Sequence, residues 1–237
     1  GFNKSHAAAY SLLAYHTGWL KVHYTAEFFC ANMTVEMDDT DKLKVLFEDA
    51  LKFGLRFDPP DVNRGSYRFE PVSDAVIRYG LGAVKGTGQQ AIEAIVRARD
   101  AGGPFASLFD FVRRVDRTRL NKRTLEALIK AGAFDSMNMN RAALVASIDR
   151  AFDFAAATLA NVNQGGLFDM MGDDAHGSST QEPDLVDAIP WGIKERLTQE
   201  KTAIGFYLSG HLFDEVASEV RKFVRSQIDE LIDSREP

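Results

Sequence analysis

The stretch YGLGAVKGTGQQAIEAIV, residues 79–96, decides how the fold of this chain is read. It places four glycines within nine residues and then continues directly into a helical pattern. Glycine adopts backbone conformations that other residues avoid and lets main-chain N–H groups approach a ligand closely, so such a loop can cradle a phosphate. That phosphate would belong to a dinucleotide cofactor, to a nucleoside triphosphate or to the backbone of DNA.

The surrounding sequence disfavours the first two of these ligands. The GxxxGxG spacing of Gly82–Gly88 fits a dinucleotide-binding loop, but Arg78 stands where a buried strand should precede it. No alternation of strands and helices follows the loop either. A Walker-type phosphate loop has its lysine after the last glycine, whereas Lys85 precedes Gly86.

The segment VKGTGQQAIEAI, residues 84–95, instead has the form of a helix–hairpin–helix. The helix after the glycines would present its N-terminal N–H groups to a DNA phosphate, a contact that is independent of base sequence. A weaker copy follows in RLNKRTLEALIKAGAFD, residues 119–135, and paired hairpins would track the two strands of a duplex. A glycine-rich turn that merely connects two helices is the alternative. The predicted DNA-binding residues are Lys85, Gly86, Thr87, Gly88, Gln89, Asn121, Lys122 and Arg123.

Hairpins of this type also occur in base-excision glycosylases, and the sequence argues against that class. The segment RRVDRTRL supplies Val115 and Asp116 but no following histidine. Gln90 stands where those enzymes have a catalytic lysine.

Charge is distributed unevenly along the 237 residues, whose formal net charge is −6. Residues 78–130 carry eleven Lys or Arg against five Asp or Glu, whereas residues 164–187 carry six acidic residues and no basic one. A basic block beside an acidic one predicts different partners for each, although a solvated helical surface would look similar.

Several classes of site and location are disfavoured by composition. Cys30 is the single cysteine and the five histidines do not cluster with carboxylates, so we expect no disulfide and no bound metal. No apolar run is long enough for a membrane span, and no signal peptide is visible. Because the chain starts without Met, we expect a piece of a longer cytoplasmic protein.

Hydrophobic spacing and capping residues predict a mainly α-helical fold with one small β-hairpin. Ser5 and Thr25 are the predicted caps of the first two helices. The β-hairpin joins residues 66–72 to residues 75–81, and residues 165–190 read as a mobile acidic linker. The predicted helices cover residues 5–24, 27–33, 38–53, 89–100, 108–115, 122–131 and 140–160, and a further one starts at 194.

Several longer motifs, in this order, resemble the α-subunit family of bacterial replicative DNA polymerase III. Thr25 and Leu212 depart from this family, which has proline at both positions. The motifs are GFNKSHAAAYSLLAYHTGWLKVHYTAEF (1–28), DPPDVN (58–63), IRYGLGAVKGTG (77–88), GGPFASLFDF (102–111), LNKRTLEALIKAGAFD (120–135) and GFYLSGH (205–211).

The resemblance implies a division of the chain into four parts. Residues 1–64 would be the C-terminal part of the fingers domain and residues 65–160 a helix–hairpin–helix domain that binds DNA and the sliding clamp. Residues 161–192 would be a mobile linker with a clamp-binding motif, and residues 193–237 a helical segment that leads to the next domain.

The resemblance also implies a DNA-directed DNA polymerase whose metal-binding aspartates lie upstream of this segment. Lys4, Ser5 and His6 would then lie near the triphosphate of the incoming nucleotide. Mg²⁺ is implied for the whole polymerase and no cofactor for this segment, which should bind DNA without polymerising it. We expect no Asp-x-Asp pair in the folded part. The adjacent aspartates Asp173 and Asp174 fall in the acidic linker, which lacks a rigid scaffold for a metal.

Gln164, Leu167 and Phe168 resemble the Q-x-x-[LM]-F peptide by which bacterial proteins bind the sliding clamp. A glutamine followed by two apolar side chains on a polar tether suits a pocket on a partner. The expected partners are therefore primer–template duplex DNA, the sliding clamp and other replicase subunits, without a membrane. A stand-alone helical DNA-binding adaptor without polymerase activity is the alternative, and the segment NKSHAAAYSLLAY argues against it.

Overall fold

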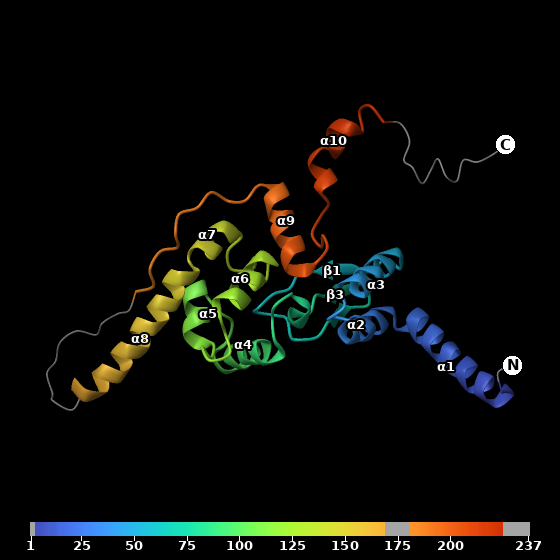
Figure 1. Cartoon of the computed structure of the whole chain (residues 1–237), viewed down its shortest axis with the longest axis horizontal. Coiled ribbons are helices and arrows are strands. Elements are labelled where there is room, and N and C mark those ends of the chain that lie inside the picture. The colour runs from blue at the N-terminus through green and yellow to red at the C-terminus, as the bar shows by residue number, and fades with distance from the viewer. Residues whose placement is uncertain (1–2, 169–180, 225–237) are drawn as a thin grey trace.

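The computed structural model describes residues 3–168 and 181–224, and its fold is mainly helical, as predicted (Figure 1). A small three-stranded sheet separates the first helices from the later ones in sequence. The elements are α1 (Lys4–His23), α2 (Thr25–Val35), α3 (Thr40–Lys52), β1 (Arg56–Asp58), β2 (Glu70–Ser73), β3 (Val76–Arg78), η1 (Leu81–Ala83), α4 (Gln89–Gly102), α5 (Leu108–Arg114), α6 (Lys122–Lys130), α7 (Arg141–Ala146), α8 (Ile148–Phe168), α9 (Ile193–Ile204), η3 (Leu212–Glu215) and α10 (Ala217–Val220).

The caps of the first two helices differ from those predicted. Asn3 is the N-cap of α1, and its side-chain oxygen accepts the Ser5 N–H at 3.2 Å, so Ser5 already lies inside the helix. Thr25 is likewise the first residue of α2, and its hydroxyl donates to the Lys21 carbonyl at 2.9 Å. The N-cap lies two positions before the predicted one in α1 and one position before it, at Tyr24, in α2, a shift typical of helix boundaries.

The predicted long helix over residues 140–160 is two helices, α7 and α8, separated by Ser147. The fully buried Ser147 hydroxyl donates to the Ala143 carbonyl at 2.7 Å and accepts the Val186 N–H at 2.8 Å. The second of these bonds draws a distant segment onto the break, which sequence periodicity does not reveal. The backbone of α8 also continues to Phe168, eight residues beyond the predicted end at residue 160.

The sheet contains the predicted β-hairpin and one additional strand. β2 pairs antiparallel with β3, and the register shifts between Pro71 and Ser73. β1 pairs parallel with β3, so that Phe57 lies opposite Ile77. The sheet therefore crosses the domain boundary predicted between residues 64 and 65, which stays a prediction.

The part of the predicted linker that the structure describes is held against the helical body. Residues 181–192 form no helix or strand, but they form hydrogen bonds with the N-cap residues of α5 and α7, with Ser147 and with α8. The Asn140 amide donates to the Ala188 carbonyl at 2.8 Å, and Leu185 packs on the core. Residues 181–190 therefore contact the body, residues 169–180 lie outside the described part, and the mobility of the linker stays a prediction.

One hydrophobic core runs from α2 to the loop after α9. Phe206 in that loop is buried, and its ring centroid lies 4.9 Å from that of Phe47 on α3. α1 projects away from this body and contributes no buried residue (Figure 1). Lys21 near its end pairs with Asp49 at 2.6 Å.

A buried ion network fixes α9 against the helices of the second half. Arg141, whose side chain is 3% exposed, makes a two-pronged contact with Asp135 at 2.8 and 2.6 Å. Glu200, 1% exposed, lies 3.7 Å from the same guanidinium. Its carboxylate also accepts the N–H groups of Leu208 and Ser209, each at 2.8 Å.

We expect Glu200→Ala to lower the free energy of unfolding by about 2–4 kcal/mol, because Arg141 loses one of its two carboxylate partners and keeps only Asp135. The N–H groups of Leu208 and Ser209 lose their acceptor at the same time. Lys194→Ala, at an exposed position of the same helix, should change the free energy of unfolding by no more than about 0.5 kcal/mol. Urea unfolding followed by circular dichroism measures both; equal stabilities of the two variants would contradict the role given to the network.

Candidate nucleic-acid interface

Two of the four glycines in the quoted stretch serve internal packing. A side-chain carbon at Gly80 would lie 2.8 Å from the carbonyl carbon of Arg68, and one at Gly82 would overlap the ring of Tyr67. Both glycines therefore allow the chain to pass close to the segment before β2. Gly80 is the N-cap of the short 3₁₀ helix η1, and Gly82 lies inside it.

The other two glycines form the first hairpin, defined as residues 84–88. Gly86 has a φ of +80°, a left-handed conformation that favours glycine. The Thr87 hydroxyl closes the turn by donating to the carbonyls of Leu81 at 3.0 Å and Val84 at 2.7 Å. Thr87 is thus bonded within the turn, while Gly86 and Gly88 are exposed.

The first hairpin leads directly into the exposed N-terminus of α4. Gly88 is the N-cap, makes no side-chain bond and has open space around its α-carbon. The Ala91 N–H donates to the Gly88 carbonyl at 3.0 Å, whereas the N–H groups of the exposed residues Gln89 and Gln90 have no acceptor within the helix. Gln89 is exposed, and its amide donates to Glu93 at 2.8 Å.

The second hairpin, defined as residues 119–123, connects α5 to α6. The side chain of Asn121 caps α6 by accepting the Thr124 N–H at 2.8 Å. The Thr124 hydroxyl in turn donates to the Gly86 carbonyl at 3.3 Å, and the Arg119 guanidinium donates to the Gln90 amide oxygen. These two bonds place the N-termini of α4 and α6 side by side.

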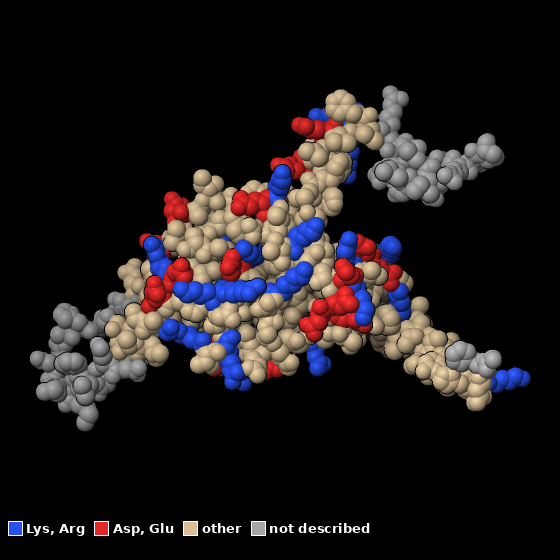
Figure 2. All heavy atoms as spheres, in the orientation of Figure 1, with Lys and Arg blue, Asp and Glu red and all other residues tan. Residues whose placement is uncertain are grey.

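The basic side chains predicted to bind DNA differ in whether a carboxylate of the fold already pairs with them. Lys85 and Arg123 are exposed and have no ion pair within residues 3–168 and 181–224. Lys122 instead pairs with Asp149 on α8, and this hydrogen bond raises the pKa of Lys122. Figure 2 shows a row of Lys and Arg side chains across the middle of this face, below α9.

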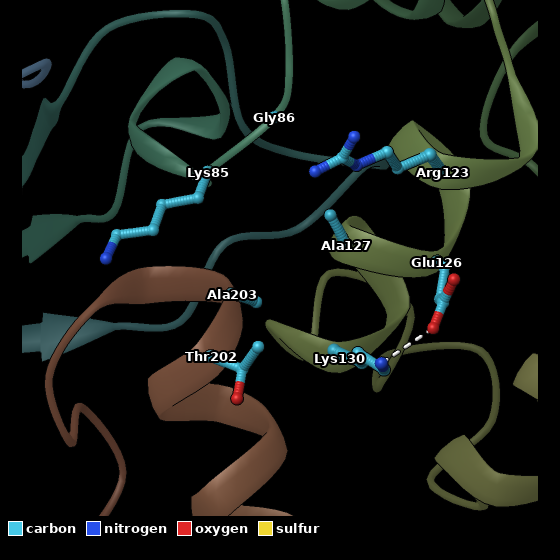
Figure 3. A pocket seen from close by; sticks show the side chains of 8 residues that line it. All are labelled: Lys85, Gly86, Arg123, Glu126, Ala127, Lys130, Thr202 and Ala203. Atoms are coloured by element: carbon cyan, nitrogen blue, oxygen red, sulfur yellow. Dashed lines mark ion pairs between the residues drawn. The ribbon is translucent and has the colours of Figure 1, made fainter.

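A hollow of about 330 Å³ opens between the two hairpins and α9 (Figure 3). The Arg123 side chain extends toward Gly86, and Lys85 lies on the far side of the hollow. Lys130 on α6 pairs with Glu126 at 2.6 Å. The residues that line the hollow are Lys85, Gly86, Arg123, Glu126, Ala127, Lys130, Thr202 and Ala203.

The sequence did not point to every residue of this surface. Arg119 lies within the basic block between residues 78 and 130, so charge was a signal for it. Thr202 and Ala203 are far from the hairpins in sequence, and nothing in their composition marks them. They reach the hollow because α9 packs on α6.

The predicted nucleotide-binding residues lie apart from the hairpins. Lys4, Ser5 and His6 form the first turn of α1, which points away from the body (Figure 1). The Ser5 hydroxyl donates to the Asn3 side chain at 2.9 Å, and the His6 ring lies 4.6 Å from that of Tyr10. Their proposed contact with a triphosphate stays a prediction.

The residues that could bind a metal are used otherwise. Contrary to the expectation above, an Asp-x-Asp pair does lie in the folded part, at Asp39 and Asp41, but Asp39 caps α3 by accepting the Lys42 N–H at 3.1 Å. No cluster of three metal-ligating side chains occurs among the described residues. Burial raises the pKa of the Cys30 thiol to about 12, so it stays protonated.

The clamp-binding motif falls at the end of α8. The backbone of Gln164, Leu167 and Phe168 is helical, whereas a flexible tether was predicted. Their side chains lie outside the described residues, so the contact with a clamp stays a prediction.

Comparisons with known proteins give one family match and a set of similar relatives. The family described as the helix-hairpin-helix motif matches residues 54–144, which include both hairpins. Over nearly its whole length, the chain is similar to DNA polymerase III subunit alpha. It is 53% identical to that of Neisseria meningitidis serogroup B over 98% of the chain, and 43% identical to that of Escherichia coli over 94% of it. The protein of Pseudomonas aeruginosa is 42% identical over the entire chain.

The resemblance inferred from the motifs is therefore confirmed. The chain spans about a fifth of the length of the curated relatives it matches. In the part of the chain that the structure describes, no helix combines the length and apolar character needed to cross a membrane.

The two hairpin glycines should differ sharply when changed to alanine. Gly86→Ala is expected to lower the free energy of unfolding by about 1–2 kcal/mol, because an alanine is strained at a φ of +80°. Gly88→Ala should be close to neutral, since its φ is −90° and its surroundings are open. Urea unfolding measures both, and equal losses would mean that the Gly86 conformation does not limit the turn.

Proposed function

We propose that this chain binds the backbone of duplex DNA through its two hairpins, within a bacterial replicative DNA polymerase. The observation that carries this proposal is the side-by-side placement of two helix N-termini, joined by the bond from Thr124 to Gly86. Exposed Lys85 and Arg123 lie on the same surface, and neither is paired with a carboxylate of the described residues. Main-chain N–H groups and free cations together are the chemistry that phosphate requires.

Such binding is independent of base sequence and depends strongly on salt. Each phosphate that a cation neutralises releases condensed counterions, so affinity falls as the salt concentration rises. The proposed contacts use backbone amides at Gly88 and Gln89 and the side chains of Lys85 and Arg123. The side chains of Thr87 and Asn121 would act indirectly by holding the turns, because their polar atoms are bonded within them.

The catalytic role would belong to the whole protein. The relatives are named DNA polymerase III subunit alpha, and this chain corresponds to a segment of them. We propose that the whole protein is a DNA-directed DNA polymerase that uses Mg²⁺, and that this segment contributes binding. Lys4, Ser5 and His6 would approach the incoming nucleotide when the rest of the fingers is present.

We further propose that Gln164, Leu167 and Phe168 dock on the sliding clamp. Two adjacent large apolar side chains in an acidic, glycine-containing stretch gain little unless a partner supplies a pocket. Because α8 begins on the body that carries the hairpins, a clamp bound at its end would be tethered near the DNA.

Opposite changes at two charged positions should shift DNA affinity in opposite directions. Arg123→Gln removes one free cation and should lower the log–log salt slope by about 0.9. Asp149→Asn releases Lys122 and removes a carboxylate, so it should tighten binding. Fluorescence anisotropy with duplexes of unrelated sequence, at several salt concentrations, measures both. As a control, Lys52→Gln removes an exposed lysine of α3. An equal loss of DNA affinity in this variant would mean that Arg123 acts only through the net charge of the chain.

For the clamp, the double change Leu167→Ala and Phe168→Ala should abolish measurable binding. Truncating each apolar anchor is expected to cost about 2–4 kcal/mol, the range of interface hot spots. Gln164→Ala should cost less, about 0.5–1.5 kcal/mol, as a single polar contact. Calorimetric titration with the sliding clamp of the same organism measures this, and DNA affinity should stay unchanged. Equal clamp affinities of all three proteins would remove the proposed role of this segment.

A further inference from the structure

We infer that α9 is a third wall of the DNA-binding surface, and that the hollow between α9 and the two hairpins holds one backbone phosphate of bound DNA. This inference rests on the proposed function, because it adds a wall to the same interface. α9 lies outside residues 54–144, the range matched by the helix-hairpin-helix family. It reaches the interface through tertiary packing alone.

α9 is held rigidly at the edge of the first hairpin. The Lys85 N–H donates to the Ala203 carbonyl at 2.7 Å, which joins the hairpin directly to the end of α9. On its other side, Glu200 meets the Arg141 guanidinium, which also donates to the Lys130 carbonyl at 3.0 Å. Because α9 is fixed to both hairpin-bearing segments, the hollow is a built feature of the fold.

The charges around the hollow favour a single anion. Lys85 and Arg123 border it without ion pairs in the described chain, whereas Lys130 and Glu126 neutralise each other at 2.6 Å. The lining thus carries a net positive charge, which a bound anion would compensate. Its volume of about 330 Å³ is at the lower end of known ligand sites, which is ample for a phosphate group.

The end of α9 also positions the Lys85 ammonium. Gly205, which caps α9, has a φ of +108°, and a side-chain carbon there would lie 2.8 Å from Lys85 Nζ. The lysine therefore lies over the C-terminus of α9, where carbonyl groups without helical partners favour a cation. The Lys85 side chain runs along the edge of the hollow, and its ammonium lies at the end farther from Arg123 (Figure 3).

The test places one carboxylate inside the hollow and a matched one outside it. Thr202 lines the hollow, while Thr198 one turn earlier does not. Both are exposed, and each hydroxyl donates to the carbonyl four residues before it, at 2.9 and 2.7 Å. We expect Thr202→Glu to weaken binding of duplex DNA by about three- to tenfold at low salt, as a nearby like charge would, and Thr198→Glu to change it less than twofold.

A third variant supplies a change of the opposite sign. Glu126→Gln removes the carboxylate that neutralises Lys130 and should tighten binding by about three- to tenfold. A loss of folding would not produce tighter binding, so this variant separates electrostatics from damage. Fluorescence anisotropy on a 20-base-pair duplex measures all three variants against the unchanged chain.

The outcomes distinguish this inference from the proposed function. If the unchanged chain does not bind duplex DNA, the proposed function fails. If it binds, but Thr202→Glu and Thr198→Glu have equal affinities, the third wall is wrong while the hairpin interface stands. An unchanged affinity of Glu126→Gln would equally overturn the phosphate site in the hollow.

Discussion

The buried contact between Glu200 and Arg141 is the constraint on which the second half of the structure depends. A carboxylate and a guanidinium that are almost fully enclosed must satisfy each other and their remaining hydrogen bonds, since either charge alone would be costly. Arg141 does so by also binding Asp135 and the Lys130 carbonyl, and Glu200 by accepting two N–H groups of the following loop. One network thereby fixes α6, α7, α9 and the loop to Ser209.

The same principle decides which cations on the surface are available. Basic side chains outnumber acidic ones between residues 78 and 130, but several are already paired within the fold. Lys122 is bonded to Asp149 and Lys130 to Glu126, whereas Lys85 and Arg123 are left at the junction of the hairpins. A nucleic-acid surface is therefore defined less by the number of basic residues than by the carboxylates that the fold brings beside them.

Local chemistry in the sequence was enough to predict the first hairpin and the helices around it. Gly86 needs a positive φ, and the helix after Gly88 follows the apolar spacing of α4, so both could be read from neighbouring residues. The break at Ser147 was missed because it depends on Val186, 39 residues away. The acidic composition of residues 165–190 predicted a mobile linker and did not reveal the bonds that residues 181–190 make to Asn140 and Ser147, across 48 and 39 residues of sequence. Thr202 was missed for the same reason, since only packing brings α9 to the hairpins.

These long-range bonds also bear on how DNA binding and clamp binding would be connected. α8 starts directly after Ser147, and the segment that follows residue 180 returns to the same residue through Val186. The Arg150 guanidinium on α8 holds that segment as well, by donating to the Asp184 carbonyl at 2.7 Å. The chain before the proposed clamp motif and the chain after it therefore both contact the helical body, and that body carries both hairpins. A partner docked at the end of α8 would be connected to the DNA-binding surface through that helix on the N-terminal side of the motif.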